Sequence, residues 1–187
     1  MSGVETKTGA HAPERKVYLD NVIVCGEIRG DLAAPELVAV LLVQQAARDG
    51  KVVSVTSREA WREQDKTKNE VLRALFHAAR GKVPVVEKDH RLLGFNHVQD
   101  QYGGFITSPM ITDVVDEPLF AHLKKAGLKE ADARHLMYAT HNGCDVFLTT
   151  DPDFVGNRFE LQKLCPGIRI LKPSDFIQEL MGAPPTP

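Results

Sequence analysis

Short apolar segments alternate with longer segments of helical periodicity along most of the chain. β-Branched and aromatic residues are concentrated in four short segments, which predicts buried strands at 16–20, 52–56, 146–149 and 168–171. Elsewhere apolar residues recur every three or four positions, which predicts helices at 36–48, between 57 and 81, and at 118–125, 129–142, 158–164 and 175–181. This alternation predicts an α/β fold with three layers, α/β/α, and a mostly parallel central sheet.

Helix ends are marked by residues with known capping preferences. Pro35 precedes the helix at 36–48 and Gly50 follows it. Ser57 and Ser174 each precede a helical segment, and a serine hydroxyl at that position commonly accepts a hydrogen bond from a free backbone N–H. We therefore expect both serines to cap helices.

Residues 82–115 interrupt the alternation. Pro84 lies within the apolar segment 83–86 and would restrict it to an edge strand, while Gly94, Gly103 and Gly104 among scattered aromatics indicate irregular structure. A stretch of this length is commonly an insertion or a functional lid. We predict a single domain at 15–181 with an insertion at 82–115, between flexible tails at 1–14 and 182–187.

The composition fits one compact domain. The chain has 187 residues, of which 43% are hydrophobic. Its net charge of −2 and pI near 6.4 lack the basic excess that is typical of nucleic-acid binding, although an acidic site would lower both values. The three cysteines have no CxxC spacing, which excludes a zinc knuckle and argues against a disulfide framework.

No membrane association is expected from the sequence. The longest apolar run, 37–43, is too short to cross a bilayer, and the N-terminus carries no stretch resembling a signal peptide. We expect a cytoplasmic protein.

Carboxylates at the ends of apolar segments are the strongest chemical signal. Asp20 ends the first predicted strand, and Asp151 and Asp153 follow the third. Asp132 and Leu136 are four positions apart, which places both on the inward face of the predicted helix. Because parallel strands end at one rim, we expect these acids to meet there. Oxygen ligands of this kind suit Mg²⁺ or Mn²⁺, which can activate water against a phosphodiester.

Each acid also has a structural explanation. Asp20 fits a turn or cap, and Asp132 fits an N-terminal helix acid that compensates the helix dipole. Asp151 and Asp153 around Pro152 fit a type I turn. Glu63 lies in a highly charged segment where glutamates are usually solvated, and Glu59 lies one turn earlier, so either residue could reach the rim.

Other catalytic signatures are missing from the sequence. The histidines, including His135, have no HExxH or Cys/His spacing, and scattered histidines usually lie at the surface or in packing positions. There is also no GxGxxG, P-loop or GxSxG motif, so nucleotide cradling and α/β-hydrolase chemistry are not supported.

In order along the chain, these residues resemble those of a PIN domain, the metal-dependent nuclease fold of VapC-type toxins and several RNA-processing enzymes. The resemblance spans most of 16–180. It rests on Val17-Tyr18-Leu19-Asp20, on Ser57 and Trp61 followed by Glu63, and most closely on the segment from Asp132 through Gly143 to Phe154. The family usually has Asp-x-Asn after the first strand, whereas this chain has Asp20-Asn21-Val22.

The resemblance implies a metal-dependent endoribonuclease. Its catalytic acids would be Asp20, Glu63, Asp132 and Asp151, and its Mg²⁺ or Mn²⁺ ligands would include Asp20, Asp132, Asp151 and Asp153. The metal ligands would in turn be held in position by Asn21, Thr149 and Thr150. The expected partners are an RNA substrate, an antitoxin or other protein, and a second copy in a homodimer.

Two other hypotheses remain open at this stage. The displaced Asn21 allows a PIN-like module that binds nucleic acid or protein without cleaving. A phosphoryl-transfer domain of the receiver or haloacid-dehalogenase type also has an aspartate after its first strand. The dehalogenase motif Asp-x-Asp needs an acid at position 22, which is valine here, so this alternative ranks low.

Overall fold

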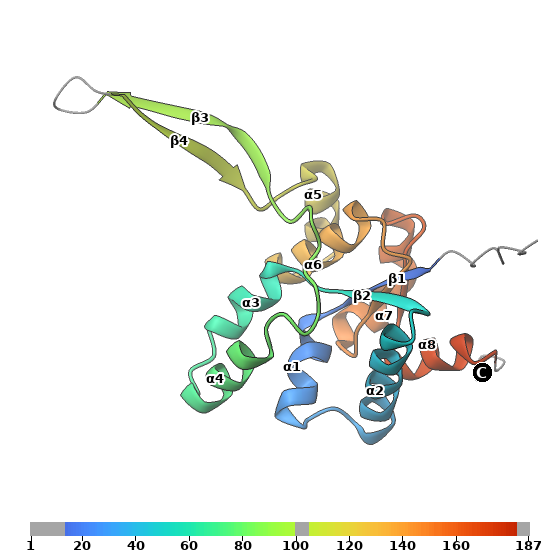
Figure 1. Ribbon diagram of the computed structural model, residues 1–187. Coiled ribbons are helices and arrows are strands. Elements are labelled where there is room, and N and C mark those ends of the chain that lie inside the picture. Colours follow the sequence, from blue (N-terminus) through green and yellow to red (C-terminus); the bar gives the residue numbers. More distant parts are fainter. Residues whose placement is uncertain (1–13, 100–104, 183–187) are drawn as a thin grey trace, which may run out of the picture.

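The central sheet of the protein is entirely parallel. The computed structural model describes residues 14–99 and 105–182. Four strands, β1 (Arg15–Leu19), β2 (Val52–Val55), β5 (Val146–Leu148) and β6 (Arg169–Leu171), form one sheet in the order β2-β1-β5-β6. Figure 1 shows helices on both faces of this sheet. The predicted α/β fold with a mostly parallel central sheet and three layers is confirmed.

Alternate strand residues supply two separate cores. Tyr18 and Phe147 point to one face, where they pack with buried side chains of α6 (Glu130–His141) and α7 (Pro152–Leu164). Val17 and Leu148 point to the other face and pack with α2 (Ala34–Arg48) and α8 (Pro173–Leu180). The remaining helices are α1 (Asn21–Arg29), α3 (Arg58–Asp65), α4 (Glu70–Ala79) and α5 (Glu117–Lys125). Burial on both faces explains why the strands are continuously apolar.

Several helix boundaries differ from those predicted. The helix α1 was not expected, and α7 begins at Pro152, where proline is favoured in the first turn, rather than at 158. Ser57 precedes α3 but makes no capping bond, because its Oγ accepts a hydrogen bond from Tyr18. Ser174 lies inside α8 and binds Glu36 instead. Ser57 thus occupies the predicted N-cap position of α3 without the expected bond, and the prediction that Ser174 caps a helix was wrong.

Residues 91–112 include a β-hairpin that projects from the body of the protein (Figure 1). The strands β3 (Arg91–Gln99) and β4 (Phe105–Thr112) pair antiparallel in a sheet of their own. The prediction of irregular structure was wrong for these strands. Gly94 marks a register shift rather than a break, and a two-stranded ribbon has only edge strands, in which Pro109 is tolerated. Gly103 and Gly104 lie outside the described residues.

The segment before the hairpin pairs only briefly with the central sheet. Val85 forms a single parallel bridge with Thr56, beyond the end of β2, so 83–86 is not a full edge strand. None of the helices in the described part of the chain is both long and apolar enough to cross a membrane.

Candidate active site

The candidate site lies at the carboxyl ends of β1 and β5, which are neighbours in the sheet. From β1 the chain proceeds to β2 on one side, and from β5 it proceeds to β6 on the other. Such a reversal of direction opens a crevice beyond the strand ends, where ligands of α/β proteins bind. Asp20 directly follows β1, and Asp151 comes three residues after the end of β5.

Asp20 is a buried carboxylate without a cationic lysine or arginine partner in the described part of the chain. It precedes α1, accepts a hydrogen bond from the Asn21 backbone N–H at 2.7 Å and another from Thr149 Oγ1 at 2.7 Å. Burial raises the pKa of Asp20 to about 6, although His135, Thr149 and the Asn21 N–H oppose the rise. Its charge is therefore costly in the absence of a cation.

Thr149 joins the ends of the two central strands. Its hydroxyl donates to Asp20 Oδ2 and accepts from the backbone N–H of Asp151 at 3.0 Å. Asp151 in turn caps α7, where its Oδ1 accepts from the Asp153 N–H at 2.7 Å. The type I turn considered for Asp151 and Asp153 is thus replaced by a helix N-terminus.

Asp132 occupies the first turn of α6 and is half-buried. Burial raises its pKa, and the charges of Asp151 and Glu63 raise it further, against smaller opposing effects of His135 and Lys129. In the described residues no lysine or arginine forms an ion pair with Asp132 or Asp151. Asp132 is therefore within electrostatic range of both Asp151 and Glu63.

His135 was not expected in this site. Its ring is buried, with Nε2 at 3.0 Å from Glu63 Oε2 and Nδ1 at 2.7 Å from the Tyr18 hydroxyl. His135 follows Asp132 by three residues, so both lie on the same side of α6. That spacing on an inward face is the sequence signal that could have identified it.

The hydrogen bonds favour a protonated His135. Because the Tyr18 hydroxyl donates to Ser57 Oγ at 2.6 Å, its oxygen is left to accept from Nδ1–H, while Glu63 accepts from Nε2–H. Burial alone would lower the pKa of His135, but the bond to Glu63 and the charge of Asp20 raise it. The raised pKa favours the imidazolium form of His135 beside Glu63.

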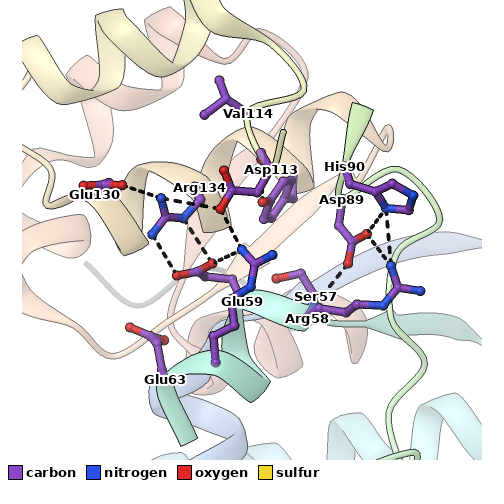
Figure 2. Close-up of polar contacts among 12 residues, drawn as sticks. Ser57, Arg58, Glu59, Glu63, Asp89, His90, Asp113, Val114, Glu130 and Arg134 are labelled. Atoms are coloured by element: carbon purple, nitrogen blue, oxygen red, sulfur yellow. Dashed lines mark hydrogen bonds and ion pairs between the residues drawn. The ribbon is translucent and has the colours of Figure 1, made fainter. Parts of the chain in front are cut away.

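Glu63 is the glutamate that faces this crevice. Burial opposes its ionisation, yet the bond from His135 lowers the pKa of Glu63 overall. Glu59, one turn earlier, is buried in an ion-pair network with Arg134 and Arg62, each with one contact at 3.1 Å. Figure 2 shows Glu59 beside Arg134 with Asp113 on the other side of the arginines, while Glu63 lies apart. Glu59 therefore anchors α3 to α6 and to the end of the hairpin.

Three other predicted residues lie beside the acids at the carboxyl ends of β1 and β5. Asp153 is half-exposed and pairs with Lys129 at 3.2 Å. The Asn21 side chain accepts a hydrogen bond from Cys25 Sγ at 3.0 Å, and its amide contributes to the lowered pKa of Glu63. Thr150 lines a neighbouring pocket. Electrostatic interactions thus link Asp20 with Glu63, and Asp132 with Asp151 and Glu63, whereas Asp153 pairs with Lys129.

The acids are near one another without forming a closed ligand cage. Across residues 14–99 and 105–182, no three Asp, Glu, His or Cys side chains are arranged so that they could hold a metal ion directly. Their oxygen donors nevertheless suit Mg²⁺ or Mn²⁺, which retain several waters and need few protein ligands. The donor chemistry fits such an ion, and the raised pKa values of Asp20 and Asp132 identify acids that a cation would stabilise.

Comparisons with known proteins identify no relative. No protein-family model matches the chain, and neither a curated protein nor a solved structure matches it.

Proposed function

We propose that the protein is a PIN-like, metal-dependent endoribonuclease. The observation that carries this proposal is the pair of acids Asp20 and Asp132, whose pKa values are raised and which have no lysine or arginine partner among the described residues. Acids of this kind at a topological switch point are typical of a site that acts on a charged ligand through a cation.

Asp20, Asp132 and Asp151 would bind a hydrated Mg²⁺ or Mn²⁺ ion in part through its retained waters, with Glu63 nearby and Asp153 as an auxiliary ligand. When bound, the ion would polarise the scissile phosphate and lower the pKa of a bound water, which supports hydrolysis to a 5′-phosphate and a 3′-hydroxyl. The contribution of the protein is orientation. Thr149 fixes one oxygen of Asp20, and His135 fixes one oxygen of Glu63.

His135 would keep Glu63 ionised while neutralising part of the acidic charge that repels an RNA strand. The imidazolium also stands where it could donate a proton to a departing oxygen, because Nε2–H is directed into the crevice at Glu63. We place His135 as a positioning residue, since its ring contacts Glu63 and Tyr18.

A binding module without turnover is the second candidate. Two observations favour it: His135 already engages Glu63, and Lys129 already engages Asp153, so two of the predicted acids have protein partners. The antitoxin, the homodimer and the cytoplasmic location remain predictions.

The substitution Asp132→Asn tests the enzyme against the module. Labelled single-stranded RNA is incubated with the protein and Mn²⁺, and the ends of the products are analysed. An endoribonuclease should lose at least about a hundredfold in rate on this substitution, keep its circular dichroism spectrum and yield 5′-phosphate ends. Asp49→Asn, at an exposed position that pairs with Lys51, is the matched control and should cleave normally.

Two outcomes would contradict the enzyme. One is the absence of any cleavage that depends on Mn²⁺ or Mg²⁺. The other is equal cleavage by the wild type and by Asp132→Asn, which would indicate a contaminating nuclease. If the wild type and Asp132→Asn bind RNA equally and neither cleaves it, the binding module is favoured.

A further inference from the structure

A pocket of about 400 Å³ adjoins the candidate site on the side of α1, α2 and α8. Its lining includes Val22, two residues after Asp20, and Thr150, directly before Asp151. Lys172, which follows β6, also lines it. The pocket therefore opens at the same carboxyl rim of the sheet as the acids, and its volume is within the roughly 300–1,000 Å³ that is usual for small-molecule sites.

The wall of the pocket combines apolar and hydrogen-bonding groups. Val22, Leu32 and Ala33 provide the apolar part, on which a planar base or a sugar could rest. Thr150 contributes a hydroxyl. Such a mixture suits a ligand with one flat, weakly polar part and one strongly polar part, as in a nucleotide.

Lys172 supplies a cationic side chain to the wall of the pocket, where the formal charges of Arg29, Lys172, Asp31 and Glu36 sum to zero. The guanidinium of Arg29 is paired with Asp31 at 2.7 Å. Both oxygens of Glu36 accept hydrogen bonds from Ser174, from its N–H at 3.0 Å and its hydroxyl at 2.7 Å. Lys172 forms no ion pair within the described residues. An anionic ligand in this pocket would therefore meet the Lys172 ammonium without having to displace a bound carboxylate.

We propose that this pocket binds one nucleotide of a single-stranded RNA, adjacent to the phosphate that is cleaved. Lys172 and Thr150 contact its phosphate, and Val22 and Leu32 contact its base or sugar. The inference rests on the proposed endoribonuclease function, because it assigns a subsite to that substrate. Thr150 and Asp151 are consecutive, so a nucleotide held in the pocket would place its neighbouring phosphate at the acids.

Equilibrium binding tests the subsite separately from catalysis. A fluorescent single-stranded RNA of about a dozen nucleotides is titrated with wild-type protein in EDTA, so that no cleavage occurs, and its anisotropy is measured at several salt concentrations. Lys172→Ala should weaken binding at least about threefold and reduce the salt slope by about one. Lys172→Glu should weaken it more, and Lys172→Arg should largely restore it.

Lys163→Ala is the matched control. Lys163 is exposed on α7 and pairs with Glu160 at 2.7 Å, so its removal changes the net charge equally without touching the pocket. Binding by this variant should stay within about twofold of the wild type. Equal losses for the Lys163 and Lys172 variants, or no loss for Lys172→Ala and Lys172→Glu, would overturn the subsite.

The outcomes separate the two proposals. If the wild type cleaves RNA but changes at Lys172 alter neither the Kd nor the KM, the subsite is wrong and the nuclease stands. If RNA binding depends on Lys172 while no metal supports cleavage, the nuclease is wrong and the pocket remains a nucleotide site. Unchanged melting temperatures of the variants exclude misfolding as the cause.

Discussion

Thr149 Oγ1 donates a hydrogen bond to Asp20 Oδ2 at a distance of 2.7 Å, and both groups are buried. The bond joins residues 129 positions apart in the chain and fixes the orientation of the carboxylate. It also stabilises the ionised form of Asp20 against the effect of burial. The orientation and the charge of Asp20 thus depend on the same hydroxyl.

Thr149→Val should therefore raise the pKa of Asp20 above 6 and weaken metal binding at neutral pH. It should also lower the free energy of unfolding by about 1–3 kcal/mol, because a buried carboxylate loses a donor. Metal titration monitored by calorimetry at two pH values checks the first effect. Thr140→Val, which removes hydrogen bonds to the backbone carbonyl of Leu136 and to Cys165, should leave metal affinity unchanged.

Asp20→Asn should stabilise the metal-free protein at neutral pH. The folded-state pKa of about 6 lies above the ordinary value of 3.8, so the folded state binds the extra proton between these values. Stability is then lost as the pH rises from about 4 to 6, by up to about 3 kcal/mol. Urea titrations across this range should show the loss in the wild type and a flatter profile in the variant. A variant less stable than the wild type at pH 7.5 would contradict the assignment.

His135→Gln should remove a different pH dependence. The folded-state pKa of His135 is raised above its ordinary value of 6.5, so its contribution is complete below that value and is lost as the pH rises through the folded pKa. The wild type should therefore lose stability on the alkaline side of 6.5, whereas His135→Gln should be less stable at pH 6 and flatter above. His141→Gln, at the exposed end of α6, is the control.

Glu59→Gln should be among the most destabilising single changes in the described chain. It would leave Arg134, whose side chain is only 12% exposed, with a weakened set of acidic partners. Removing one member of a buried ion pair typically costs about 3–5 kcal/mol. Glu130→Gln, at the exposed end of the same network, should cost under about 1 kcal/mol. Chemical denaturation of both variants measures the difference.

Shortening the hairpin should leave the rest of the fold intact. Arg91 pairs with Thr112, so an Asn-Gly turn in place of 92–111 can close the chain there. Leu92, Phe95 and Ile111 are each more than half exposed, and little burial would be lost. The melting temperature should change by only a few degrees or less, and solubility should rise. A cooperative loss of structure would show that the hairpin supports the domain.

The sequence allowed prediction of the sheet because strands buried on both faces are continuously apolar and short. It also allowed prediction that Asp20 and Asp151 follow strands of one parallel sheet, and the two strands are neighbours. The hairpin was missed because Gly94 was taken as a sign of irregular structure, whereas a two-stranded ribbon tolerates it at a register shift.

The choice between Glu59 and Glu63 could not be made from the sequence. It depends on Arg62 and Arg134, which hold Glu59, and on His135, which holds Glu63. Arg134 and His135 come from a helix about 70 residues later, and their contacts arise only when α6 packs against α3. Periodicity within one segment carries no information about such a pairing.

The buried imidazolium has a consequence for assembly. A crevice of bare carboxylates would resist closing until an ion arrived from solution. Because His135 is a cation below its raised folded-state pKa, it relieves part of that repulsion, and α3 and α6 can pack around an ionised Glu63. Folding of these two helices would then not require a metal ion.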